Sequence, residues 1–123
     1  MTEVERFYED KVVFITGGTG FIGKVLLEKL LRCTDIRKVY LLIREKKGIS
    51  PQARLDQLFD SKLFDTIKDV KKSAIDKVVA MPGDIDQPLL GLCTEDQDTV
   101  LREVGSSIGD FSMTNILYFL NLG

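Results

Sequence analysis

Four glycines stand within seven residues near the N-terminus, in the run Gly17-Gly-Thr-Gly-Phe-Ile-Gly23. Glycine costs about 0.5–1 kcal/mol relative to alanine inside a regular element, so such a cluster needs a reason. The spacing satisfies GxGxxG from Gly18 and GxxGxxG from Gly17, and both patterns are typical of a turn that binds a pyrophosphate. Amides at the start of the following helix would then point at phosphate oxygens. The turn predicts a dinucleotide site formed by Thr16, Gly17, Gly18, Thr19, Gly20, Phe21, Ile22 and Gly23.

A glycine turn of this kind has two other interpretations. A P-loop would require Ser or Thr after Gly23-Lys24, and Val25 stands there instead, so the hydroxyl ligand for magnesium is missing. A purely structural turn remains an alternative. The strand-like run before the turn and the helix-like run after it favour dinucleotide binding.

A basic residue closes the second apolar run. Arg44 follows Val39–Ile43, where an acidic residue would bind the adenosine ribose and select NAD. A guanidinium there suits the 2′-phosphate of NADP, and such a charge-assisted hydrogen bond contributes roughly 1.5–3 kcal/mol. The acidic residue Glu45 would instead favour NAD, but it stands one position past the end of the strand. We therefore expect NADP, with an ordinary surface charge as the alternative role of Arg44.

An acidic residue closes the third apolar run, in the sequence Gly83-Asp-Ile85. Ligands of doubly wound sheets gather at the carboxyl ends of the strands. Asp84 could accept a hydrogen bond from the adenine amino group while Ile85 packs on the ring. The alternative is an Asp that only stabilises a turn.

These candidate residues require alternating strands and helices to position them. The pattern predicts the α/β fold class, with a Rossmann-like doubly wound parallel sheet. The sheet is predicted to have three to four strands and is therefore an incomplete Rossmann sheet. Strands are predicted at Val12–Ile15, Val39–Ile43 and Lys77–Met81. Helices are predicted over Phe21–Arg32, over Glu95–Val104 after Thr94 as N-cap, and twice between Arg44 and Asp76, the first beginning at Pro51 after Ser50 as N-cap.

Composition excludes several other classes of protein. The 123 residues carry a net charge of −2, so no overall basic field would attract nucleic acid. Histidine is absent and the two cysteines, Cys33 and Cys93, form no CxxC pattern, so neither a metal site nor a disulfide is expected and a cytosol-facing compartment fits best. The apolar run Ile116–Leu120 is far shorter than the roughly 20 residues of a transmembrane helix, and no transmembrane segment is expected.

Taken together, these segments resemble the N-terminal part of the fatty acyl-CoA reductases, in the extended short-chain dehydrogenase/reductase superfamily. The resemblance covers roughly Val4–Val104. The segments that carry it are Phe14–Arg32, Val39–Arg44, Gly83–Ile85, the helical insertion between Ser50 and Ile75, and Gln87–Leu92.

The resemblance implies NADPH-dependent reduction of a long-chain fatty acyl-CoA to a fatty alcohol through an aldehyde. It places the pyrophosphate on Gly17, Gly20 and Gly23, the 2′-phosphate on Arg44 and the adenine on Asp84. It also implies the cytosol-facing surface of the peroxisome or the endoplasmic reticulum as the location.

The resemblance weakens after Val104. We therefore expect residues 1–104 to be the N-terminal portion of an NAD(P)-binding domain and residues 105–123 to be a divergent tail, with Ile116–Leu120 as a candidate strand. The family's catalytic Tyr-x-x-x-Lys has no counterpart, because Val12, Arg44 and Leu122 stand four residues after Tyr8, Tyr40 and Tyr118.

No catalytic residue is thus expected in this chain, which would carry only the cofactor-binding portion of the enzyme. Two alternatives stay open. One is a non-catalytic NADP-binding module that associates with a full-length reductase. The other is a relative of the sugar-nucleotide epimerases and dehydratases.

Overall fold

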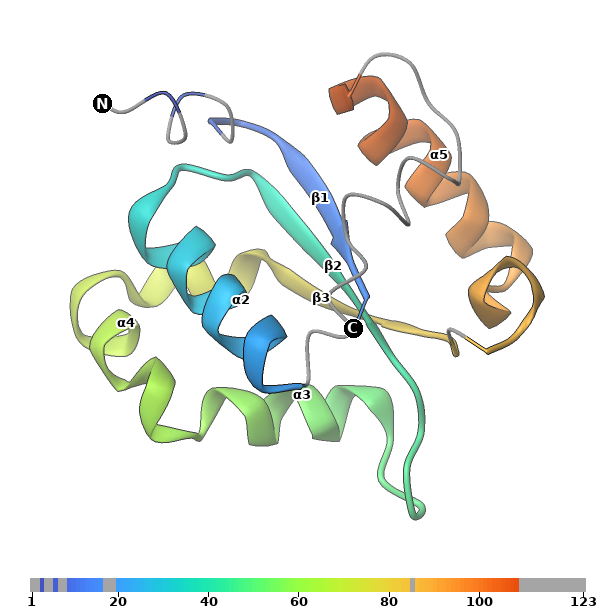
Figure 1. The fold of residues 1–123 in the computed structure, drawn as a ribbon, viewed down its shortest axis with the longest axis horizontal. Coiled ribbons are helices and arrows are strands. Elements are labelled where there is room, and N and C mark those ends of the chain that lie inside the picture. The colour runs from blue at the N-terminus through green and yellow to red at the C-terminus, as the bar shows by residue number, and fades with distance from the viewer. Residues whose placement is uncertain (1–2, 4–5, 7–8, 17–19, 85, 109–123) are drawn as a thin grey trace.

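The computed structural model describes residues 3, 6, 9–16, 20–84 and 86–108 of the chain. Its centre is a sheet of three parallel strands, β1 (Val12–Ile15), β2 (Lys38–Ile43) and β3 (Val78–Pro82), in the order β1-β2-β3 (Figure 1). The three predicted strands and the parallel sheet are therefore confirmed, with bounds that differ by one residue at β2 and β3. β3 begins at Val78 because Lys77 still belongs to the preceding 3₁₀ turn.

The first two strands are covered on both faces. All four residues of β1 and five of the six residues of β2 are buried. Their continuous apolar sequence is the pattern that parallel strands require, because helices cover both sides of such a sheet. β3 is less covered, since Val78 and Met81 are buried while Val79 is exposed.

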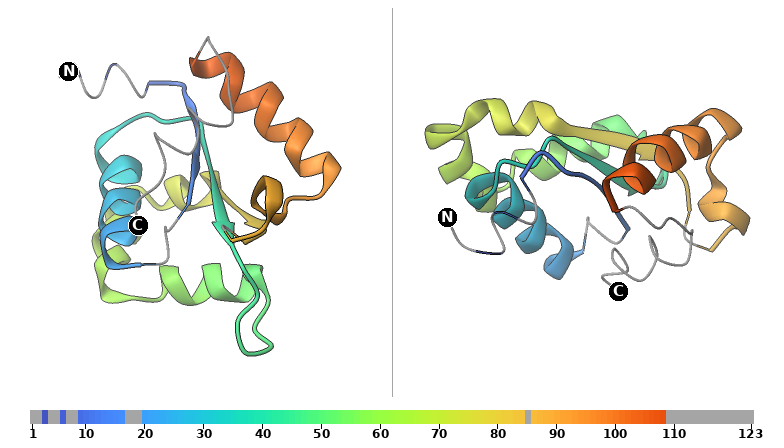
Figure 2. Two further views of the ribbon diagram at one scale, coloured as in Figure 1. Left: turned by 45° about the vertical axis from the view of Figure 1, so that its right-hand side comes forward. Right: turned by 90° about the horizontal axis from the view of Figure 1, so that it is seen from above.

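The helices lie on the two faces of the sheet, as a doubly wound fold demands. Helices α2 (Phe21–Cys33), α3 (Pro51–Phe59) and α4 (Asp65–Val70) lie on one side, and α5 (Thr94–Ile108) lies on the other, where it packs against β1 (Figure 2). α5 begins at Thr94, which was expected as its N-cap, and it continues past the predicted end at Val104. No helix within the described part of the chain has the length and apolar content that crossing a bilayer requires.

The insertion between β2 and β3 begins as predicted. The Ser50 side chain accepts a hydrogen bond from the Ala53 amide at 3.2 Å, and Pro51 occupies the first turn of α3. The second predicted helix is short, because α4 is flanked by 3₁₀ turns at Lys62–Phe64 and Lys72–Lys77. Phe59 and Phe64 pack edge to face, with ring centroids 5.2 Å apart, and join the two parts of the insertion.

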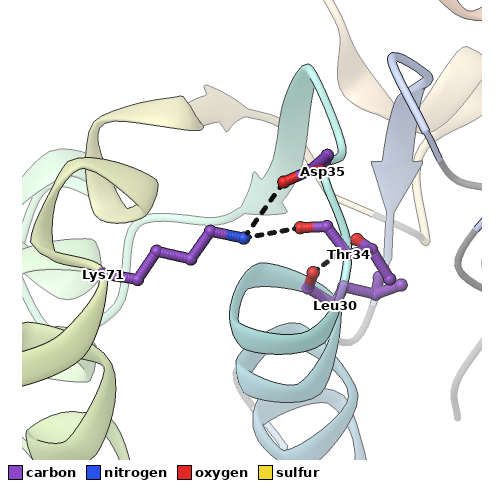
Figure 3. Close-up of polar contacts among 4 residues, drawn as sticks. All are labelled: Leu30, Thr34, Asp35 and Lys71. Carbon is purple, nitrogen blue, oxygen red and sulfur yellow. Dashed lines mark hydrogen bonds and ion pairs between the residues drawn. The ribbon is translucent and has the colours of Figure 1, made fainter. Parts of the chain in front are cut away.

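One lysine ties this insertion to the end of α2. The Lys71 ammonium donates to the Thr34 carbonyl oxygen at 2.9 Å and pairs with the Asp35 carboxylate at 3.5 Å (Figure 3). The Thr34 hydroxyl donates in turn to the Leu30 carbonyl oxygen at 2.5 Å. A cation at the carboxyl end of a helix is also favoured by the helix dipole.

The predicted strand at Ile116–Leu120 and the division of the chain at residue 104 remain predictions, and residues 109–123 lie outside the described residues.

Candidate functional site

The carboxyl ends of the three strands lie at one edge of the sheet. Ile15 at the end of β1 pairs in register with Leu41, and Ile43 at the end of β2 pairs with Pro82 at the end of β3. The Gly83 amide continues this ladder by donating to the Ile43 carbonyl oxygen at 3.3 Å. The residues that follow the strands therefore share the edge at which ligands of doubly wound sheets bind.

The glycine turn is described only at its two ends. Thr16 is buried at the end of β1, and Gly20 is the extended N-cap residue of α2. Gly23 is buried and Phe21 is 83% exposed on the same helix. The candidate residues Gly17, Gly18 and Thr19 and the side chain of Ile22 lie outside the described residues.

The start of α2 is open to an anion. The N-cap residue Gly20 has no side chain that could accept a hydrogen bond from the first-turn amides, and no acidic residue stands in the first turn. Such a helix start has amides and a dipole that favour a phosphate. This end of the glycine turn thus fits the predicted pyrophosphate site.

A cleft of about 380 Å³ lies between the segments that follow β2 and β3. It brings together two of the predicted residues, Arg44 from the end of β2 and Asp84 from the end of β3. The full lining is Arg44, Glu45, Pro51, Pro82, Gly83, Asp84, Gln87 and Gly91. Ile85, predicted to pack on the adenine, lies outside the described residues.

Arg54, which is not among the predicted site residues, supports Arg44 from the first turn of α3. Its guanidinium Nη1 donates to the Arg44 carbonyl oxygen at 2.7 Å, which fixes the backbone at the end of β2. A signal for this role exists in the sequence. A cation in the first turn of a helix opposes the helix dipole, so Arg54 after the N-cap Ser50 needs another reason to be there.

Asp84 organises the loop that carries it. Its Oδ1 accepts a hydrogen bond from the Asp86 amide at 2.9 Å, and its own amide donates to the Leu90 carbonyl oxygen at 2.8 Å. The Gln87 amide donates to the Asp84 carbonyl oxygen at 3.0 Å. The alternative role of Asp84, the stabilisation of a turn, is therefore present, and this turn holds the carboxylate at the wall of the cleft.

The same loop contains strained backbone. Leu89, Leu90 and Gly91 all have positive φ angles, of 51°, 61° and 64°. Left-handed backbone costs roughly 1–2 kcal/mol at each of the two leucines. Burial of the Leu90 side chain offsets part of this cost, because a fully buried leucine contributes about 1.5–3 kcal/mol. Strain of this kind is typical of segments whose position matters for a site.

Tyr40 does not belong to the cleft. Its hydroxyl donates to the Glu103 carboxylate of α5. Burial first, and then the hydrogen bond to Glu103, raise the pKa of Tyr40 to about 12. This tyrosine thus joins β2 to α5, and Arg44 rather than a lysine stands four residues after it.

The open parallel sheet, with helices on both faces, defines a Rossmann-type α/β domain. The chain belongs to the NAD-binding family described as male sterility protein, which matches residues 15–109. It is 45% identical over 102 residues to a fatty acyl-CoA reductase 1 of Xenopus laevis and 42% identical over 102 residues to that of Mus musculus, in each case over 82% of this chain and 20% of the relative. The chain thus spans about a fifth of the length of these curated relatives.

A solved structure also shares the fold. The reductase domain of a non-ribosomal peptide synthetase from Mycobacterium tuberculosis superimposes with a TM-score of 0.62 and 31% identity, over 78% of this chain and 23% of that one. The predicted family and the Rossmann-like α/β fold are confirmed by these matches. The coarser part of the cofactor prediction, a nicotinamide dinucleotide, is supported as well.

Proposed function

We propose that this chain is the cofactor-binding part of an NADPH-dependent fatty acyl-CoA reductase. The observation that carries the proposal is the cleft that joins Arg44 from the end of β2 to Asp84 from the loop after β3. These positions match the order in which a dinucleotide crosses the edge of a doubly wound sheet, with pyrophosphate at the helix and adenosine beyond it.

The residues would divide the cofactor between them. The Arg44 guanidinium would pair with the 2′-phosphate, while Arg54 holds the Arg44 backbone in place. Because Asp84 Oδ1 is engaged with the Asp86 amide, Oδ2 is the oxygen we assign to the adenine amino group. The amides after Gly20 would bind the pyrophosphate, together with Gly17 and Gly23 of the predicted turn.

The reaction we propose for the whole enzyme is reduction of a long-chain fatty acyl-CoA to a fatty alcohol through the aldehyde. The names of the relatives support the acyl-CoA substrate. When bound, the nicotinamide supplies the hydride, and this chain's own residues bind and orient the adenosine end. The same names favour a reductase over a sugar-nucleotide epimerase or dehydratase. Association with a full-length reductase and a cytosol-facing location at the peroxisome or the endoplasmic reticulum stay predictions.

The test is the preference between the two dinucleotides. Calorimetry would measure the binding of NADPH and NADH to the chain and to an Arg44→Asp variant. We expect the preference for NADPH to fall by about tenfold or more, because a charge-assisted hydrogen bond is lost and 1.4 kcal/mol corresponds to tenfold. A Lys62→Asp variant makes the same change of charge at an exposed position outside the cleft and should leave the preference unchanged.

Two results would contradict the proposal. An unchanged ratio of affinities in Arg44→Asp would remove Arg44 from the 2′-phosphate site. Failure of the unaltered chain to bind either dinucleotide would count against the cofactor-binding role as a whole.

A further inference from the structure

The charges of the cleft do not all suit a phosphate. Its lining combines one guanidinium, that of Arg44, with the carboxylates of Glu45 and Asp84. Asp84 is partly engaged by its own loop through the Asp86 amide. Glu45 is exposed, and within the part of the chain that the structure describes its carboxylate makes no hydrogen bond or ion pair. Glu45 is therefore the carboxylate most available to a ligand.

The fold explains why Glu45 lines the cleft although it stands past the end of β2. The chain reverses directly after it, because the Lys46 and Ile49 amides donate to each other's carbonyl oxygens at 3.2 and 2.9 Å. Lys47 and Gly48 occupy the turn with positive φ angles of 52° and 77°. This tight reversal leads the chain back to Pro51, which lines the same cleft.

We infer that Glu45 is a specificity-determining residue that opposes Arg44, an inference that rests on the proposed function. A 2′-phosphate carries close to two negative charges, so Arg44 attracts it and Glu45 repels it. The ribose of NADH instead presents an uncharged 2′-hydroxyl, whose proton a carboxylate accepts in a hydrogen bond. Glu45 thus reduces the preference of the cleft for NADPH over NADH.

The experiment isolates the 2′-phosphate by using two fragments of the cofactor. Adenosine 2′,5′-bisphosphate and adenosine 5′-monophosphate differ only in that phosphate and need no contact with the nicotinamide site. Calorimetry would measure the affinities of both fragments for the chain and for a Glu45→Gln variant, which keeps the shape of the side chain. We expect the ratio of affinities to shift toward the bisphosphate by about threefold to fivefold, the effect of a charge interaction in an exposed cleft.

A matched variant separates this local effect from net charge. Asp69→Asn removes one negative charge from an exposed position of α4 outside the cleft, and it should leave the ratio unchanged. The shift in Glu45→Gln should also shrink at high ionic strength, because salt screens exposed charges.

The outcomes separate the inference from the proposed function. If the unaltered chain prefers the bisphosphate and Glu45→Gln leaves the ratio unchanged, the role of Glu45 is refuted and the cofactor-binding function stands. An equal shift in Asp69→Asn would likewise refute it, since net charge would then account for the effect. If the unaltered chain binds neither fragment, both the proposed function and the inference fail.

Discussion

Replacing Gly83 by alanine should destabilise the chain and disturb the cleft. Gly83 joins β3 to the loop of Asp84, and there is no room for a side chain at this position. A Cβ atom would lie 2.4 Å from Leu42 Cδ1 and 2.5 Å from the Leu90 carbonyl oxygen. Leu42 can move its side chain, but the Leu90 oxygen is backbone and accepts the hydrogen bond from the Asp84 amide. The loop must therefore shift to admit a methyl group.

The magnitude follows from three contributions. Overpacking a filled site costs typically 1–3 kcal/mol, and loss of the Asp84–Leu90 hydrogen bond costs about 0.5–1.5 kcal/mol. The lower entropy of alanine in the unfolded chain offsets about 0.4–1 kcal/mol of this. We expect a net loss of about 2 kcal/mol in the free energy of unfolding, which corresponds to a fall of roughly 10 °C in Tm.

Urea unfolding of both chains, followed by circular dichroism, measures this difference. Gly48→Ala is the comparison variant, because a Cβ there meets nothing within 4 Å and only the positive φ of 77° is unfavourable. It should cost about 1–2 kcal/mol without weakening the binding of adenosine 2′,5′-bisphosphate, whereas Gly83→Ala should weaken it. Surface substitutions typically change the free energy of unfolding by no more than about 0.5 kcal/mol. If Gly83→Ala changes it by no more than that, the loop moves freely and the Leu90 carbonyl oxygen does not exclude a side chain at this position.

Two other contacts allow shorter tests. The folded-state pKa of Tyr40 is raised from 10.0 to about 12, so its contribution to stability is present below about pH 10 and is lost as the pH rises through 12. Absorbance titration of the folded chain should show one tyrosine that ionises at a higher pH than an ordinary tyrosine. Tyr40→Phe should remove this high-pH change in absorbance. If the change persists in the variant, it belongs to another tyrosine. Lys71→Met removes the hydrogen bond to the Thr34 carbonyl oxygen and should lower the free energy of unfolding by about 1–2 kcal/mol. Lys72→Met, at an exposed neighbouring position, should change it little, and equal losses in the two variants would rule out a specific role for the Lys71 contact.

The strands were predictable from the sequence because their signals are local. A run such as Val12–Ile15 is apolar at every position, which is what a strand buried between two layers of helices requires. The N-cap at Ser50 was predictable for the same reason, since a cap and its helix lie within one turn of chain. Arg44 could be named because it directly follows β2, and Asp84 because only Gly83 separates it from the end of β3.

Tertiary structure alone decided which exposed charges share the cleft. Pairing of β2 with β3 in register brings residues 44 and 84 to one edge, although forty positions of chain separate them. The reversal after Glu45 returns that carboxylate to the same cleft, and the entry into α3 sets Arg54 against the Arg44 carbonyl oxygen. The contact that excludes a side chain at Gly83 arises in the same way, from a carbonyl oxygen seven residues further along a folded loop. Hydrophobic spacing along the chain encodes which face of an element is buried, but the distances between the ends of different elements depend on how the chain crosses over and packs.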